Sequence, residues 1–359
     1  MIIKRDYYLQ QLISSKSNNL IKIVTGIRRS GKSFLLFNLF HNHLIETGIS
    51  EDHIIEIALD DRLNKNLRDP DVILQHIHER IVDDKLYYII LDEVQMIDEF
   101  TDVLNSLLHI RNADVYVTGS NSKFLSKDVV TEFRGRGDEI HLFPLSFAEL
   151  YNSIGGDKFE LWKSYYTYGG LPGILELDSE KKKAAYLRSL HETVYLKDII
   201  ERNNLKNSEE FMELMRVMAS CIGSPCNPSK LENTFKSVKN ETLDRKTISK
   251  YLSYMEDAFL IEKSMRYDIK GRKYIGTLSK YYFQDIGLRN ALLNFRQVEE
   301  NHIMENVIYN ELRLRGFCVD VGMVEARTAK ERKQLEVDFV ANMADRRYYI
   351  QSAFAMPDD

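Results

Sequence analysis

The sequence predicts an α/β protein whose N-terminal part is a parallel sheet with helices on both faces. Short apolar segments alternate there with helix-length segments, as in a parallel sheet. A glycine-containing loop, GIRRSGKS at residues 26–33, lies between the first apolar segment and a helical one. The segment YYIIL at residues 87–91 is apolar throughout, as a strand buried on both faces should be, and Asp92-Glu93 follow it. Together these observations predict a P-loop nucleotide-binding fold.

The expected elements follow one another regularly along this part of the chain. A short polar helix within residues 1–20 precedes five strands, at residues 20–25, 53–59, 86–91, 115–118 and 140–143. Helices are expected at residues 33–47, 70–82 and 100–110. Parallel strands need such crossover connections, so the alternation agrees with the sheet type.

The pattern changes after Pro144. Residues 146 to about 202 are expected to be helical, with a break at GGLPG. Strand-like segments are expected at residues 261–267 and 280–283. A helix over residues 246–259 that runs into residues 260–265 has the helix-then-hairpin order found in winged-helix domains. The last stretch begins with a helix at 301–315 and continues as strands. We therefore expect four parts, namely residues 1–145, 146–205, 206–296 and 297–359.

Composition excludes several classes of protein. Apolar residues make up 44% and charged residues 29% of the 359 residues, which is ordinary for a globular protein. The net charge of −5 excludes a uniformly basic nucleic-acid binder, so any DNA site must be a local patch. No apolar run approaches a membrane span, and the N-terminus lacks the apolar region of a signal peptide. The three cysteines lack zinc-site spacing, and so few fit a reducing compartment. We expect a cytoplasmic protein without a membrane partner.

The glycine-containing loop has the residues of a phosphate site. Its glycines let the backbone wrap round phosphates, while backbone N–H groups and the helix N-terminus attract negative charge. Lys32 is expected to reach the β- and γ-phosphates, and the Ser33 hydroxyl to bind Mg²⁺. Arg28 and Arg29 are open to two interpretations, contact with phosphate or with another domain. The residues expected to contact the nucleotide here are Gly26, Arg28, Arg29, Ser30, Gly31, Lys32 and Ser33.

An acidic pair follows the third expected strand, where an open α/β sheet binds its ligands. Asp92 is expected to hold Mg²⁺ through water, and Glu93 to act as the general base for the attacking water. Hydrolysis depends mostly on positioning and charge stabilisation, so few groups suffice. The alternative is that Asp92-Glu93 is only a polar strand end without a function. Because the same chain also contains the phosphate loop, the pair predicts catalysis.

Two further segments contain residues that are candidates to contact the phosphoryl group transferred in the reaction. Thr118, Ser120 and Asn121 follow an expected strand, where a sensor of the γ-phosphate would lie; an ordinary strand-to-turn signal is the alternative. Arg134 and Arg136 in FRGRGDE could supply an arginine finger, in the same chain or to a neighbouring subunit. A solvated basic loop is the alternative for this segment.

The chain resembles the bacterial and archaeal AAA+-like ATPases that have an N-terminal ATPase domain and a C-terminal domain of unknown function. The similarity runs over nearly the whole chain, through TGIRRSGKS, LDEVQ, TGSNS, RGR before FPLSFAEL, YGGLPG, VYLKDIIER, ISKYLSYMEDAFLIEK, KYYFQDIGLRNAL and EVDFV. It implies an ATPase of the additional-strand class with sheet order 5-1-4-3-2, a helical lid at 146–205 and a winged-helix region. It also implies ATP and Mg²⁺ as cofactors, sites shared in a homo-oligomer, and Arg136 as the better finger candidate.

The C-terminal part resembles a restriction-endonuclease-like fold. Such nucleases use a helix glutamate, a strand aspartate and a Glu-x-Lys on the next strand, and Glu305 and Asp338 match the first two. On the segment 349–353, expected to be the next strand, Gln351 and Ala353 replace the acid and the lysine. An amide is a poor substitute for an anionic ligand, and alanine cannot orient water. We therefore expect a degenerate domain that does not cut DNA and that is truncated before a closing helix. Cleavage would be possible if Lys330 or Lys333 replaced the missing lysine.

Three functions remain open at this point. The first is an ATPase switch that acts on DNA or a protein partner, the second an ATP-gated nuclease, and the third a binding module whose ATP site does not turn over. Glu93 argues against the third, and the incomplete Glu-x-Lys argues against the second. DNA could bind the expected winged helix through Arg245, Lys246 and Lys250, although such charges also occur on a solvated face.

Overall fold

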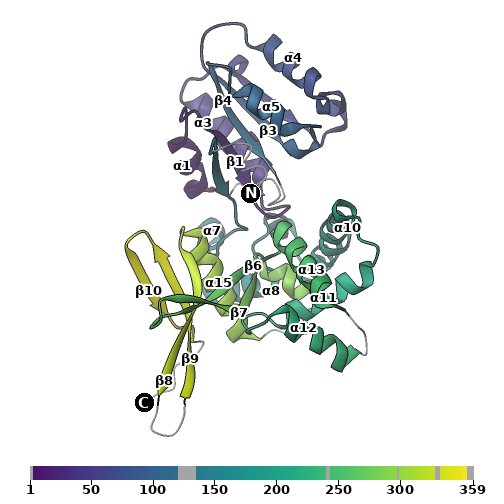
Figure 1. Ribbon diagram of the computed structural model, residues 1–359. Helices are drawn as coiled ribbons and strands as arrows, with labels where there is room; N and C mark the ends of the chain where they lie inside the picture. The colour runs from purple at the N-terminus through teal and green to yellow at the C-terminus, as the bar shows by residue number, and fades with distance from the viewer. Residues whose placement is uncertain (1–2, 120–134, 240–242, 297–298, 328–331, 354–359) are drawn as a thin grey trace. The chain divides into compact units, whose positions relative to one another are not determined.

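The computed structural model describes residues 3–119, 135–239, 243–296, 299–327 and 332–353 (Figure 1). Contacts between residues divide the chain into two compact units, Met1–Leu142 and Phe143–Asp359. No helix in the described ranges is long and apolar enough to cross a bilayer.

The first unit is built on a parallel five-stranded sheet with the order β2-β3-β4-β1-β5. This is the order 5-1-4-3-2 counted from the other edge, so the predicted P-loop NTPase fold is confirmed. The strands lie close to their predicted positions. They are β1 (Ile21–Thr25), β2 (Ile54–Ala58), β3 (Tyr87–Asp92), β4 (Ala113–Thr118) and β5 (Gly137–His141).

Helices cover both faces of this sheet (Figure 1). On one face, Tyr8 and Phe40 pack with Tyr88 in a buried cluster. On the other face, Ile73 and Val103 pack in a second cluster. The first face is covered by α1 (Asp6–Ser14) and by the continuous helix α2 (Lys32–Phe34), η1 (Leu35–Phe40) and α3 (His41–Glu46); the second by α4 (Pro70–Arg80) and α5 (Phe100–Leu107). Two 3-10 turns, η2 (Glu51–His53) and η3 (Arg62–Arg68), flank β2.

One buried ion pair fixes β1 beside β4. Lys22 is fully buried within the apolar strand β1, and its ammonium pairs with Asp114 on β4. The Tyr116 hydroxyl donates to Asp114 at 2.9 Å, and the Ser17 backbone N–H donates to it at 3.0 Å. A buried charge that loses its partner is strongly destabilising, so this pair disfavours any other register of the two strands.

The second unit combines helices with a mixed sheet of order β10-β9-β8-β6-β7. Its strands are β6 (Ile261–Asp268), β7 (Lys273–Phe283), β8 (Cys318–Arg327), β9 (Arg332–Met343) and β10 (Arg346–Ile350). Its helices are α7 (Phe147–Ile154), α8 (Lys158–Tyr168), η6 (Pro172–Glu176), α9 (Glu180–Leu190), η7 (His191–Leu196), α10 (Lys197–Asn203), α11 (Ser208–Ser220), α12 (Pro228–Thr234), η8 (Phe235–Lys239), α13 (Arg245–Asp257), α14 (Ile286–Leu292) and α15 (Glu300–Leu314). The helical stretch after residue 146 and the helix before the last strands are therefore present as predicted.

The predicted helix followed by a hairpin is also present, as α13 followed by β6 and β7. The hairpin does not stand alone, because β6 pairs in parallel with β8 and so joins the same sheet as the C-terminal strands. The strand expected at residues 349–353 was wrong in its extent, since β10 ends at Ile350. The reason is that the Ser352 backbone N–H donates to the Asp338 carboxylate at 2.7 Å rather than to a neighbouring strand. The division into four parts stays a prediction.

The turn after α8 is held by a buried carboxylate. Asp285 is 2% exposed and accepts hydrogen bonds from the backbone N–H of Gly170 at 2.8 Å and of Leu288 at 2.9 Å. Burial raises the pKa of Asp285 to about 6, although these backbone donors oppose the shift. Gly169 has a φ of 77°, and a Cβ there would lie 2.4 Å from this carboxylate. The glycines of YGGLPG therefore let the chain approach Asp285 closely.

We expect Asp285→Ala to destabilise the second unit strongly. At least two buried backbone N–H groups would lose their acceptor, which costs about 1–3 kcal/mol each. Urea unfolding of the full chain, followed by fluorescence of its one tryptophan, Trp162 on α8, measures the effect.

The matched control is Asp178→Ala, which removes an exposed ion pair to Lys182. Such pairs contribute about 1 kcal/mol or less, so the control should unfold almost like the parent. An Asp285→Ala midpoint equal to that of Asp178→Ala would show that the buried carboxylate does not hold the turn.

Candidate functional site

The predicted phosphate loop follows β1 directly and takes a conformation that depends on its glycines. Gly26 has a φ of 138°, and a Cβ there would lie 2.2 Å from the Leu142 carbonyl oxygen. Gly31 has a φ of 98° and is the N-cap of the helix that begins at Lys32. No side chain caps this helix, so its N-terminus faces the loop without a competing acceptor from a cap residue.

Lys32 lies within the loop, as the sequence predicts. Its side chain is buried, and the Nζ ammonium donates to the Gly26 carbonyl at 3.0 Å and to the Ile27 carbonyl at 3.2 Å. Both acceptors are neutral loop carbonyls. Phosphate oxygens carry negative charge and form stronger charge-assisted hydrogen bonds with an ammonium group, so they would compete well with these carbonyls.

The two predicted magnesium-binding residues lie side by side. The exposed Ser33 hydroxyl donates to Asp92 Oδ2 at 2.7 Å, and the Thr118 hydroxyl donates to Asp92 Oδ1 at 2.5 Å. Burial raises the pKa of Asp92, while the bonds from Thr118 and Ser33 oppose the shift. A hydroxyl and a carboxylate oxygen in contact are hard oxygen donors of the kind Mg²⁺ prefers, so these two residues fit that ion.

Glu93 has a backbone conformation that is unusual for a residue other than glycine. Its φ is 54°, in the left-handed region, and its N–H donates to the Thr118 hydroxyl at 2.8 Å. The Gln95 side-chain amide donates to Glu93 Oε2. Thr118 is fully buried and bonds both acidic residues, so it supports the pair instead of presenting a free sensor group. The other sensor candidates, Ser120 and Asn121, lie outside the described residues.

The remaining loop residues differ in their exposure. Arg28 is half-buried, and Arg29 is exposed with a φ of 66°. Ser30 is fully buried, and its carbonyl accepts a hydrogen bond at 3.3 Å from Arg5, which the sequence analysis missed. Arg5 is 4% exposed and its guanidinium lies 4.6 Å from the centre of the Tyr8 ring. Nothing in the sequence distinguished it from other basic residues near the N-terminus.

Arg136 lies at the end of the sheet where β1 and β5 begin, whereas the phosphate loop follows the carboxyl end of β1. Its carbonyl accepts a hydrogen bond from the Ile21 N–H at 2.9 Å, at the start of β1, and its side chain is exposed. Since β1 and β5 are parallel, four rises of about 3.3 Å, roughly 13 Å, separate this level from Thr25, which precedes the loop. This placement is too far for Arg136 to reach its own phosphate loop. The alternative candidate, Arg134, lies outside the described residues.

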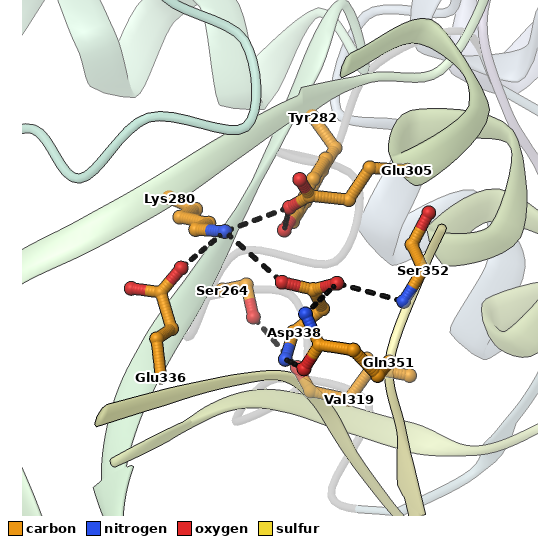
Figure 2. Close-up of polar contacts among 9 residues, drawn as sticks. All are labelled: Ser264, Lys280, Tyr282, Glu305, Val319, Glu336, Asp338, Gln351 and Ser352. Atoms are coloured by element: carbon orange, nitrogen blue, oxygen red, sulfur yellow. Dashed lines mark hydrogen bonds and ion pairs between the residues drawn. The ribbon is translucent and has the colours of Figure 1, made fainter. Parts of the chain in front are cut away.

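A second polar cluster lies in the second unit (Figure 2). Lys280 on β7 is 2% exposed, and its Nζ lies 2.8 Å from Glu305 Oε1, 2.7 Å from Glu336 Oε1 and 4.0 Å from Asp338 Oδ1. Burial lowers the pKa of Lys280, but Glu305 and Glu336 outweigh burial and raise it overall. The Tyr282 hydroxyl also donates to Glu305 at 2.7 Å. Lys280 is therefore a buried cation surrounded by three acidic side chains.

The cluster brings together residues that the sequence predicted, among them Glu305 and Asp338, and others that it did not, Lys280 and Glu336. Gln351 donates to Asp338 Oδ2 at 2.8 Å. A pocket of about 410 Å³ opens beside them, lined by Asn301, His302, Glu305, Asp338, Gln351, Ser352 and Ala353. Lys330 and the side chain of Lys333 lie outside the described part of the chain. Sequence analysis missed Lys280, and the available signal was a lone charge beside the apolar run Tyr-Tyr-Phe of a buried strand.

The basic residues expected to read DNA are exposed on α13. Arg245, Lys246 and Lys250 all face solvent, and the Lys250 ammonium lies 5.7 Å from the centre of the Tyr254 ring. Asp244 caps the start of this helix, accepting from the backbone N–H of Lys246 at 2.8 Å.

Comparison with known proteins identifies two regions of the chain. Residues 18–151 match the family model of an AAA domain, and residues 159–299 match a domain of unknown function, DUF8612. Among solved structures, the chain is similar to an Aeropyrum pernix ORC1 protein in complex with DNA, with 12% identity, a TM-score of 0.33, and coverage of 81% of this chain and 92% of that one. It is also similar to Cdc6p from Pyrobaculum aerophilum, with 12% identity, a TM-score of 0.35, and coverage of 86% and 96%.

Two relatives align over most of their length. An uncharacterised protein of Haemophilus influenzae is 34% identical over 365 residues, which cover 100% of this chain and 88% of that protein. An uncharacterised protein of Methanocaldococcus jannaschii is 30% identical over 357 residues, which cover 94% and 75%. The AAA domain agrees with the P-loop sheet and supports a nucleotide-binding role of the ATPase type. The chain belongs to the same family as these bacterial and archaeal relatives, and its residues 18–151 match the model of an AAA domain.

Proposed function

We propose that the protein binds ATP with Mg²⁺ and hydrolyses it, acting as a nucleotide-driven switch on DNA or a protein partner. The observation that carries this proposal is the direct contact between Ser33 and Asp92, 2.7 Å apart, beside Lys32 and Glu93. These residues come from the loop after β1 and the end of β3. Parallel strands bring such segments to one edge of the sheet, where α/β proteins bind ligands.

Each of these residues has a distinct task in the proposed reaction. Lys32 exchanges its loop carbonyl acceptors for the β- and γ-phosphate oxygens, together with the loop N–H groups. Ser33 and Asp92 hold Mg²⁺, which when bound neutralises charge on the phosphates. A bound cation would oppose the effect of burial on the pKa of Asp92 and so favour the carboxylate form.

Glu93 supports hydrolysis over binding alone. The carboxylate follows the strand end directly, and as a general base it takes a proton from the attacking water. The Thr118 hydroxyl fixes the Glu93 backbone at 2.8 Å, so the base is attached to the same strand edge as the magnesium ligand. A module that only bound ATP would have no use for this arrangement.

Arg136 is proposed as an arginine finger that acts on a neighbouring protomer. It lies beside Ile21, at the amino-terminal end of β1, which is too distant from the loop at the carboxyl end of β1 in the same chain. An exposed arginine at that end suits contact with another copy, so the proposal requires a homo-oligomer.

The second unit is proposed to transmit the nucleotide state to a partner. We propose a helical lid at residues 146–205, a winged-helix-like part at 206–296 and a degenerate endonuclease-like part at 297–359. The exposed Arg245, Lys246 and Lys250 on α13, which precedes the β6–β7 hairpin, support DNA as a partner.

An ATP-gated nuclease is the second candidate function, and Lys280 is the observation that favours it. An ammonium beside Glu305 and Asp338 restores the missing basic group. We nevertheless propose a site that does not cut, because Lys280 bonds directly to Glu305 and Glu336 and neutralises acids that would otherwise bind metal. Gln351 adds no charge to the site.

We expect the variants of Lys32 and Glu93 to separate binding from hydrolysis. Lys32→Ala removes a direct phosphate contact and should weaken ATP binding at least tenfold, about 1.4 kcal/mol. Glu93→Gln removes only the base, so ATP affinity should persist while turnover falls ~100-fold or more. Calorimetry and steady-state phosphate release measure the two effects.

The control for both is the exposed acid Asp52, whose change to Asn should alter neither quantity. Unchanged affinity in Lys32→Ala would refute the nucleotide site. Parental turnover in Glu93→Gln would leave the site but remove the proposed base.

Turnover per chain should rise with protein concentration if Arg136 acts on a neighbour. Assembly supplies the finger, so Arg136→Ala should lose this dependence and stay at the low rate of dispersed chains. Phosphate release over a hundredfold dilution series, with sedimentation at each concentration, tests the idea. A flat specific activity in a protein that sediments as a monomer would contradict it.

The second unit is expected not to cut DNA. Plasmid and single-stranded DNA should stay intact with Mg²⁺ or Mn²⁺, with or without ATP, in a preparation that turns over ATP. Cleavage by a metal-dependent site needs an anionic pocket for the ion and a positioned water, and Lys280 neutralises part of that pocket. Robust nicking that disappears in Asp338→Ala would make the nuclease the better function.

A further inference from the structure

Gln95 is a residue of the LDEVQ segment that the proposed reaction has not used. It lies in the short turn η4 (Val94–Met96), two residues after Glu93. Its side-chain Nε2 donates a hydrogen bond to Glu93 Oε2. The Glu93 backbone is already fixed by its N–H bond to Thr118 at 2.8 Å. Glu93 is therefore held both at its backbone, by Thr118, and at its carboxylate, by the Gln95 amide.

The other end of the Gln95 side chain is less favourably placed. Its Oε1 is buried, and among the described residues it has no hydrogen-bond partner. A buried acceptor without a partner lowers stability, whereas an apolar side chain of similar size would avoid that loss. Packing alone therefore does not account for glutamine here, but a requirement for a neutral donor to Glu93 does.

The chemistry of the pair also selects an amide. An ionised carboxylate only accepts hydrogen bonds, so the partner at Oε2 must be a donor. A lysine at this position would neutralise the proposed base, and a glutamate would repel it. The amide donates one hydrogen bond and leaves the net charge of the carboxylate unchanged. It can therefore orient a base without quenching it.

We propose that Gln95 is a positioning residue that holds the Glu93 carboxylate in the orientation from which it takes a proton from the attacking water. This inference rests on the proposed hydrolysis by Glu93. The effect falls on turnover, since the amide donates its hydrogen bond to the base. Orientation of a reacting group within about 1 Å has large effects on rate.

The test compares Gln95→Met with Gln95→Glu in the full chain. Gln95→Met keeps the side-chain length and removes the donor, so kcat should fall about tenfold or more while KM and the calorimetric Kd for ATP stay within about twofold. Its melting temperature should equal or exceed that of the parent, because the buried Oε1 is removed. Gln95→Glu is nearly isosteric but places a like charge beside Glu93, and its kcat should fall further.

A fall in kcat without a fall in melting temperature supports positioning, since a purely structural role would reduce stability first. Unchanged or increased kcat in Gln95→Met would overturn the inference, and so would a loss of kcat that accompanies weaker ATP binding and a lower melting temperature. Should Gln95→Met fold poorly, the kinetics of Gln95→Glu decide in the same way.

Glu93→Gln, measured in parallel, separates the two hypotheses. If it turns over ATP at the parental rate, Glu93 is not the base and the proposed reaction fails together with the inference. If Glu93→Gln is inactive and Gln95→Met is as fast as the parent, only the role of Gln95 is refuted.

Discussion

The proposed chemistry depends on the hydrogen bonding of one buried carboxylate, Asp92. It accepts from Ser33 at the start of the loop helix and from Thr118 at the end of β4, while itself ending β3. Three segments distant in sequence thus meet at a single group. This is possible because the strands are parallel and in register, so that their carboxyl ends reach the same edge. The Lys22–Asp114 pair, buried between β1 and β4, opposes slippage of that register.

The Lys280 cluster and the Asp92 site compensate buried negative charge in opposite ways. In the second unit, Lys280 is a built-in cation that compensates Glu305 and Glu336. In the first unit, the side-chain donors to Asp92 among the described residues are the hydroxyls of Ser33 and Thr118, and burial raises the pKa of Asp92. An acid compensated only by neutral donors still gains from a bound cation, whereas one already paired with an ammonium gains less. This contrast is the physical reason for placing Mg²⁺ at Asp92 and for expecting the other cluster to be structural or to bind without cutting.

The features that the sequence predicted well are those with local signals. The loop conformation at Gly26 and Gly31 and the meeting of Ser33 with Asp92 follow from strand periodicity and a short motif. The strand order was implied by the family resemblance and not by these local signals. Lys280 could not be placed, because its acids lie on α15 and β9 and the hairpin joins their sheet only through the tertiary pairing of β6 with β8. The end of β10 was predicted wrongly because a side chain, Asp338, captures the Ser352 N–H. Thr118 has the position expected of a sensor, but tertiary hydrogen bonds assign it to the acidic pair.

The role of Asp92 as a magnesium ligand is tested by the dependence of ATP affinity on free Mg²⁺ in the parent and in Asp92→Asn, measured by calorimetry. The asparagine keeps the size of the side chain and its capacity to accept from Ser33, but it removes the negative charge that holds the ion. We expect Mg²⁺ to strengthen ATP binding to the parent at least tenfold, about 1.4 kcal/mol, and most of this gain to be lost in the variant. An equal gain from Mg²⁺ in both proteins would contradict the assignment of the site.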